Sequence, residues 1–137
     1  MSIDPVVMAP VLGEPSLPAV RPTALEVSDA DLERIRARAQ SPERFRVRAY
    51  RFAGDTLCRA QRFATLRRVL GDAFLYREFP DEAGNPAGLR AQGKPPHSVF
   101  TGDLIDEPGA LTRQAVDEVI AFFRERLSTG GGAPAPT

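Results

Sequence analysis

The chain has 137 residues with 18 basic and 18 acidic side chains, so its formal net charge is zero at pH 7. This balance excludes the strongly basic composition typical of proteins that bind nucleic acid or an anionic membrane. A hydrophobic content of 42% excludes a wholly disordered chain, and a single cysteine excludes an intramolecular disulfide and a cysteine-based zinc cluster. We expect one domain over residues 1–127 and a disordered tail over 128–137, in a cytoplasmic protein without a signal peptide or membrane span.

The first part of the chain predicts a short strand and then a helix. An apolar run over residues 6–12 is broken by a proline, which lacks the backbone donor of a sheet ladder and so indicates a short or edge strand. Further prolines in 13–27 predict an irregular connection. A helix is expected at about 28–40, because Ser28 and Asp31 form a pair that resembles a capping box.

The middle of the chain predicts two strands with a helix between them. Residues 46–53 have the composition of a strand, which a Gly-Asp pair ends. A helix is expected at about 59–70, with Gly71 after its last turn. Residues 74–79 predict another strand.

The last part predicts a long loop and a final helix. The loop over 80–111 is rich in Gly and Pro and holds the only histidine, His97, so we interpret it as functional. Thr112 is expected to cap a helix over about 113–127. The apolar stripe expected to be buried on this helix consists of Ala115, Val116, Val119, Ile120, Phe123 and Leu127.

The alternation of strands and helices predicts an α/β fold with a partial parallel sheet and flanking helices. In such sheets ligands bind at the carboxyl ends of the strands. Asp55 follows the strand that ends near Ala53, and His97 follows the strand that ends near Phe79. We therefore expect the two side chains to lie close together at the same end of the sheet.

Asp55 and His97 are the candidate catalytic residues. Aspartate before histidine is the second half of the nucleophile, acid, histidine order of α/β-hydrolases. The carboxylate can accept a hydrogen bond from the imidazole and fix its tautomer, which leaves the other ring nitrogen as a base. No Gly-x-Ser-x-Gly or Gly-x-Cys-x-Gly motif precedes them, so we expect no nucleophile in this chain. Alternatively, Asp55 is a turn residue and His97 is incidental.

Other polar residues have weaker signals. Cys58 stands near the start of a predicted helix, where a thiol can be reactive, but we favour a small apolar residue packed under the loop. Asp103, Asp106 and Glu107 could join the candidate catalytic pair as oxygen ligands of a metal. Their spacing matches no calcium loop, so we expect solvated or capping side chains instead.

Several segments resemble the dienelactone hydrolase family. The segment with Asp55 (Arg-Phe-Ala-Gly-Asp-Thr-Leu-Cys) is similar to the acid-bearing part of that family, and His-Ser-Val-Phe-Thr at His97 is similar to its histidine-bearing part. An early Pro-Val-Leu-Gly-Glu-Pro run resembles the strand and loop after the nucleophile helix. The segments concerned are 10–18, 51–58, 62–67, 84–88, 97–101 and 104–109.

The resemblance implies a three-layer α/β-hydrolase fold, of which residues 1–127 correspond to the C-terminal half. It implies that Asp55 is the acid and His97 the base of a triad whose Cys or Ser nucleophile lies on an elbow. Three residues, at two places in the chain, depart from the family pattern. Ala87 stands where a polar residue or a histidine is expected, and Ala110 with Leu111 replaces a His-Pro pair.

We therefore predict a hydrolase of small carboxylic esters or lactones, present as a fragment that is inactive by itself. No cofactor, metal, nucleic acid or membrane partner is expected. The alternative is a non-catalytic partner-binding α/β module, in which an exposed sheet edge recruits another chain or a second copy.

Overall fold

The computed structural model describes residues 8–14, 27–41 and 45–128. Most of the expected connection at 13–27 and the expected tail from residue 129 onward lie outside these residues. Ser128, which we assigned to the tail, is the last residue of a helix.

The elements follow the predicted order, and most of their ends agree within two residues. The strands and α-helices are β1 (Val11–Leu12), α1 (Asp29–Ala39), β2 (Val47–Phe52), α2 (Ala60–Leu70), β3 (Phe74–Phe79) and α3 (Leu111–Ser128). Three short 3₁₀ helices complete the described part, namely η1 (Gly71–Ala73), η2 (Asp81–Ala83) and η3 (Leu89–Gln92). The predicted loop at 80–111 therefore contains two helical turns and is otherwise irregular.

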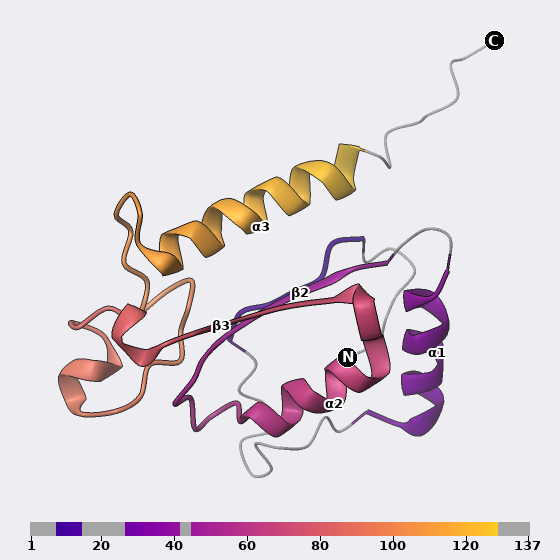
Figure 1. Cartoon of the computed structure of the whole chain (residues 1–137), viewed down its shortest axis with the longest axis horizontal. Helices are drawn as coiled ribbons and strands as arrows, with labels where there is room; N and C mark the ends of the chain where they lie inside the picture. The colour runs from indigo at the N-terminus through magenta and orange to yellow at the C-terminus, as the bar shows by residue number, and fades with distance from the viewer. Residues whose placement is uncertain (1–7, 15–26, 42–44, 129–137) are drawn as a thin grey trace.

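The three strands form a parallel sheet in the order β1-β2-β3. Val11 pairs with Arg48, and Val47 pairs with Phe74. Helices α1 and α2 cover one face of the sheet, and α3 lies on the other (Figure 1). The predicted parallel sheet with flanking helices is confirmed.

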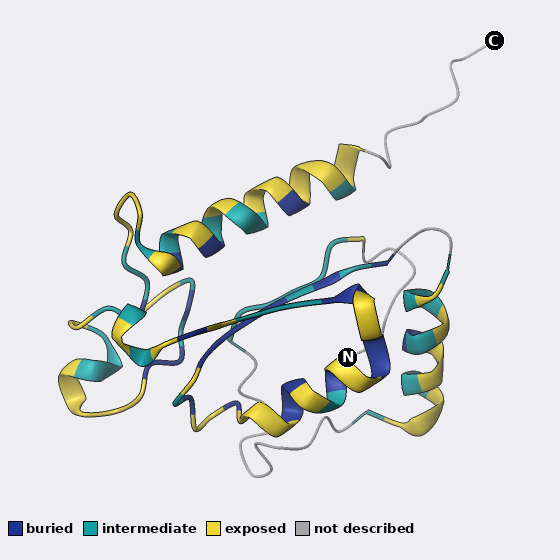
Figure 2. Cartoon of the chain, viewed as in Figure 1, coloured by how far each residue is buried: buried dark blue, intermediate teal, exposed yellow. Residues whose placement is uncertain are grey.

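The central strand β2 contributes to a separate apolar cluster on each face of the sheet. Val47 and Ala49 pack with α1 and α2, whereas Tyr50 and Phe52 belong to the cluster beneath α3. Most of β2 is buried because both faces are covered, as is usual for strands of parallel sheets. Figure 2 shows buried residues along the strands and on the sheet-facing side of the helices.

The helix ends follow the sequence signals on α1 and α2. The Ser28 hydroxyl oxygen accepts a hydrogen bond from the Asp31 N–H at 3.1 Å and donates to the Asp31 carboxylate at 2.8 Å. Gly71 ends α2 with a φ of +53°, which residues with a Cβ rarely adopt. Both predicted helix boundaries are confirmed.

Helix α3 differs from the prediction in its buried face. Phe122 is 3% exposed, whereas Phe123 is 38% exposed and Leu127 is 59% exposed. Thr112 does not cap the helix, because it lies inside the first turn, where its hydroxyl accepts the N–H of Ile105 at 2.9 Å. The expected stripe, which also included Ile120, is therefore wrong in its outer half, because α3 turns the flank with Ala115 and Val119 to the cluster on the sheet and leaves the other flank exposed.

A polar cluster attaches α3 to the sheet. The Glu118 carboxylate pairs with Arg77 and with Arg48, and it accepts a hydrogen bond from the Tyr50 hydroxyl at 3.0 Å. Burial, opposed in part by Arg48, raises the pKa of Tyr50 to about 12, so the hydroxyl stays protonated and continues to donate. In the described part of the chain, no helix is both long enough and apolar enough to cross a membrane.

The adjacent phenylalanines of α3 test its orientation on the sheet. Phe122→Ala should lower the free energy of unfolding by about 3 kcal/mol, because it removes a buried aromatic side chain. Phe123→Ala should change it by less than about 1 kcal/mol, because that ring is partly exposed. Urea unfolding followed by circular dichroism measures both. A larger effect at Phe123 would show that the other face of α3 packs on the sheet.

Candidate active site

Asp55 and His97 meet at the carboxyl ends of β2 and β3, as predicted. Asp55 lies in the turn after β2, and His97 lies in the loop after β3. Asp55 Oδ2 and His97 Nδ1 are 2.6 Å apart, a hydrogen-bond distance. The residues are 4% and 7% exposed, respectively, so the pair is shielded from water along most of its surface.

The second oxygen of Asp55 holds the turn in which the residue lies. Asp55 Oδ1 accepts the N–H of Leu57 at 2.9 Å and the N–H of Cys58 at 3.1 Å. These bonds stabilise the ionised carboxylate and fix its orientation. These two backbone bonds therefore orient Oδ2 toward His97 independently of the bond to the imidazole.

Arg51 also holds the turn that contains Asp55. It is 3% exposed and donates to the carbonyl oxygens of Ala53, Asp55 and Cys58 at 3.1, 3.4 and 3.2 Å. Its guanidinium also pairs with the Glu78 carboxylate on the neighbouring strand. The turn is thus tied to both β2 and β3.

Gly54 allows a close approach between the two loops of the site. Its N–H donates to Asp81 Oδ1 at 2.8 Å, and a Cβ at this position would lie 2.1 Å from Asp81 Oδ2. A side chain at Gly54 would therefore displace the Asp81 carboxylate, which is the acceptor of the Gly54 N–H. The glycine thus leaves room for Asp81, at the start of the histidine loop, to bind the turn that holds Asp55.

The end of β1 also contacts the histidine loop. Glu14 Oε1 accepts the N–H of Phe100 at 3.3 Å and the hydroxyl of Thr101 at 2.9 Å. The Phe100 ring packs so closely on Gly13 that a Cβ there would lie 2.3 Å away. All three strands therefore contribute to the site at their carboxyl ends.

The charges near His97 favour its protonated form. The hydrogen bond that His97 donates to Asp55 raises the pKa of His97 above its ordinary value of 6.5, burial opposes this, and the charges of Asp55, Glu14 and Asp103 add to the rise. With Nδ1 donating to Asp55, the neutral ring carries its free electron pair on Nε2. Within the described ranges, Nε2 has no hydrogen-bond partner. It is also not one of the fully buried polar atoms that lack a partner, so it keeps some access to solvent.

Cys58 is an apolar packing residue, as we favoured. It is fully buried, and burial, the largest effect, raises the pKa of its thiol. Its Sγ lies 3.9 Å from the Arg62 guanidinium. The thiol at the start of α2 therefore lacks the depressed pKa of an activated nucleophile.

The acidic cluster in the histidine loop is dispersed. Asp106 pairs with Arg113 at the surface, Glu107 is exposed, and Asp103 is fully buried with backbone N–H partners. The expectation of a solvated side chain is thus wrong for Asp103, whereas a capping role describes it well. No group of three or more potential metal ligands occurs in the described part of the chain.

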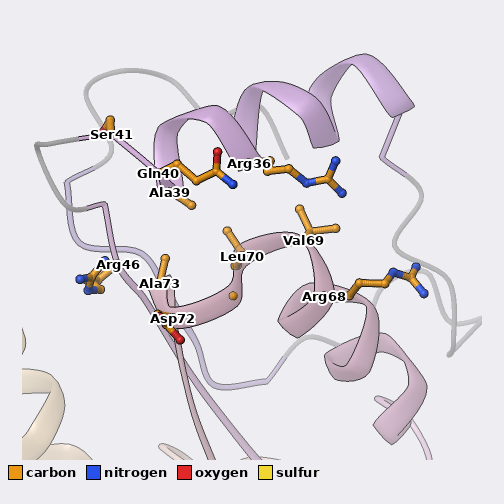
Figure 3. Close-up of a pocket in the computed structure, with 11 residues that line it drawn as sticks. Arg36, Ala39, Gln40, Ser41, Arg46, Arg68, Val69, Leu70, Asp72 and Ala73 are labelled. Atoms are coloured by element: carbon orange, nitrogen blue, oxygen red, sulfur yellow. The ribbon is translucent and has the colours of Figure 1, made fainter.

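A cavity of about 650 Å³ lies at the opposite end of the sheet (Figure 3). It is bounded by the last turns of α1 and α2 and by the residues that precede β2 and β3. Arg36, Arg46 and Arg68 line it together with Asp72. Because it lies at the amino ends of the strands, it does not adjoin the Asp55–His97 pair.

Several residues that support the pair had no sequence signal strong enough to find them. Glu14 and Asp81 bind backbone groups of distant segments. Arg51 and Asp103 bind backbone groups that the turn and the loop bring back to them. Such contacts leave no spacing pattern along the chain. Only Asp103 was weighed as a functional residue, as a possible metal ligand, and a solvated or capping role was favoured for it.

The single histidine of the chain makes the pair directly measurable by NMR. Asp55→Asn should lower the pKa of His97, because the carboxylate that raises it is lost while burial, which lowers it, persists. A titration of the imidazole carbon-bound protons measures this change. Asp72→Asn, an exposed site at the far end of the sheet, should leave the titration unchanged. An unchanged pKa in Asp55→Asn would contradict the observed hydrogen bond.

Comparisons with known proteins add no assignment to this geometry. No protein-family model matches the sequence, and no match is found among curated proteins or solved structures. A function for the chain is therefore inferred from the site itself and from the sequence segments that form it.

Proposed function

We propose that this chain carries the acid and base residues of an α/β-hydrolase that cleaves carboxylic esters or lactones. The observation that carries the proposal is the 2.6 Å contact between Asp55 Oδ2 and His97 Nδ1 at the carboxyl ends of adjacent parallel strands. Two of the segments that resemble dienelactone hydrolases, 51–58 and 97–101, contain these two residues. The substrate class follows from that resemblance.

The Asp55–His97 pair can take a proton from a nucleophile and later give it to a leaving group. His97 Nε2 removes the proton of a hydroxyl or thiol as that group attacks the substrate carbonyl carbon, and a new bond to carbon forms. The imidazolium that results is stabilised by the Asp55 carboxylate. When the ester C–O bond breaks, Nε2 returns the proton to the leaving oxygen. Water repeats the cycle and releases the acid.

The nucleophile must come from outside the described residues. Within those residues, no hydroxyl or thiol hydrogen-bonds to His97 Nε2, and the Cys58 thiol is fully buried. A further parallel strand beside β1 would end at the same edge as Asp55 and His97. A residue that follows such a strand would approach Nε2, because Glu14, at the end of β1, already contacts the histidine loop.

The release of p-nitrophenol from p-nitrophenyl acetate as its acetyl group passes to added 2-mercaptoethanol tests the acid–base proposal. We expect no turnover above background without the thiol. With it, the rate should exceed that of His97→Gln by about tenfold, below the 10²–10⁴-fold of a fully positioned group. Asp55→Asn should lose most of the gain. The rate should fall as the pH falls through the raised pKa of His97, because protonation removes the base.

Two outcomes would contradict this prediction. Equal rates for the wild-type chain and His97→Gln with the thiol present would remove the base role of His97. Turnover without the thiol that is lost in Cys58→Ser would make Cys58 the nucleophile, against its burial and raised pKa.

A second candidate function, a non-catalytic partner-binding module, is favoured by an apolar flank of α3. Exposed Ile120, Phe123 and Leu127 form a stripe on this helix. Successive helix residues turn by about 100°, which puts Gln114 and Glu118 on the opposite flank. These two residues contact Arg77 on β3, so the stripe lies on the side of β1.

The stripe and the free edge of β1 thus face the same direction. Within the described residues β1 is an edge strand, and Arg126 of α3 donates to the Met8 carbonyl just before it at 3.3 Å. The occupant that we propose for this second function is another copy of the chain. Two β1 edges can pair antiparallel about a two-fold axis, which brings the two stripes together over the joint.

Self-association tests the second candidate. We expect a concentration-dependent dimer in sedimentation velocity, and Phe123→Arg should shift it to monomer because it places a charge in the stripe. Ala121→Arg introduces the same charge at an exposed position outside the stripe and should leave the dimer intact. A wild-type chain that is monomeric at all concentrations, or equal effects of both variants, would contradict the proposed dimer.

A further inference from the structure

Asp103 connects three separate segments of the long loop between β3 and α3. It is fully buried, with a relative exposure of 0%. Its Oδ2 accepts the N–H groups of His97 and Ser98, and its Oδ1 accepts the N–H of Leu89, all at 2.9 Å. Its own backbone donates to the Ser98 carbonyl at 3.0 Å and accepts the Asn85 N–H at 2.8 Å.

The Asp103 carboxylate is held by backbone groups and not by a cation. In the described part of the chain, no arginine, lysine or histidine side chain forms an ion pair with it, and its three contacts are N–H donors. Hydrogen bonds from N–H groups stabilise a buried carboxylate and are stronger than bonds between neutral groups. Because an unpaired buried charge is costly, the loop is constrained to keep all three N–H groups in place.

Gly88 provides the space for this arrangement. A Cβ at Gly88 would lie 2.3 Å from Asp103 Oδ1 and 2.6 Å from the Gly102 carbonyl oxygen. A side chain there would displace the carboxylate from the Leu89 N–H. The positions of Gly88 and Asp103 are therefore mutually dependent.

We propose that Asp103 is a positioning residue of the candidate active site, which fixes the backbone at His97 so that Nδ1 meets Asp55. The catalytic value of this positioning rests on the proposed function. The geometry that it controls can be measured without turnover.

Substitution Asp103→Asn is the direct test. The amide has one acceptor oxygen, so it cannot accept N–H bonds on both sides as the carboxylate does. We expect the low-field NMR signal of the Nδ1 proton of His97 to be lost or broadened. Hydrogen exchange at the amides of His97, Ser98 and Leu89 should become at least about tenfold faster, because local opening is easier.

A second variant, Glu14→Gln, separates the effect of a nearby charge on His97 from the effect of the position of its backbone. The charges near His97 are those of Asp55, Glu14 and Asp103. Glu14→Gln removes one of them, but its remaining oxygen can still accept the Phe100 and Thr101 bonds. This variant should lower the pKa of His97 and keep the Nδ1 proton signal. Asp103→Asn should change both.

Two further variants keep the test decisive. Asp106→Asn makes the same chemical change at an exposed position of the loop, and it should alter neither the Nδ1 signal nor amide exchange. If Asp103→Asn does not fold, Gly88→Ala provides the measurement, since it leaves the charge and displaces the carboxylate. It should weaken the Nδ1 signal.

The proposal is overturned if the folded Asp103→Asn or Gly88→Ala chain keeps the wild-type Nδ1 signal and amide exchange. It stands if the signal is lost in these variants and retained in Asp106→Asn. If the signal is lost in Asp103→Asn but the wild-type chain gives no His97-dependent thiol reaction, the hydrolase proposal fails while the positioning role of Asp103 holds.

Discussion

The loops at the carboxyl ends of the strands are arranged around the hydrogen bond between Asp55 and His97. A buried carboxylate is stable only when N–H groups or charges replace the water that it loses. Asp55 meets this need with two backbone N–H groups of its own turn and with the imidazole. The imidazole must therefore be brought to one defined place, which requires parallel strands that end at the same edge of the sheet.

Acidic side chains that bind backbone N–H groups recur throughout this end of the molecule. Asp81 binds the N–H of Gly54, Glu14 binds that of Phe100, and Asp103 binds three from the histidine loop. The Asp81 and Glu14 bonds join segments that are distant in sequence, and the Asp103 bonds join parts of one long loop. Irregular loops have few backbone partners of their own, so carboxylates take the place of a regular hydrogen-bond ladder.

The β1 side of the described domain has an unpaired strand edge and an apolar surface. Beyond β1 the described sheet ends, and α3 presents exposed Ile120, Phe123 and Leu127 on that side. An unpaired strand edge beside an apolar helix flank is a surface that another strand can cover. Both proposed functions use this edge: a nucleophile-bearing strand would complete a catalytic site there, and a second copy would complete a sheet.

The sequence by itself determined the alternating elements, the parallel sheet and the pairing of Asp55 with His97. These depend on local signals: the Ser28 cap, the Gly71 helix end, and apolar runs that end before polar loops. Because parallel strands share one carboxyl edge, the position of two residues after two strands already places them together. The resemblance to dienelactone hydrolases added roles for them but no contact.

Only the tertiary structure decided which side chains support that pair and which face of α3 is buried. The apolar residues of α3 cover a wide arc, so periodicity could not choose between Phe122 and Phe123. The contacts of Glu118 with the sheet fix the rotation of the helix in which Phe122 is buried. Likewise, Asp103 and Asp106 are alike in sequence, and one is buried while the other is exposed. Their difference depends on which backbone N–H groups the folded loop directs toward each carboxylate, and chain spacing does not encode that.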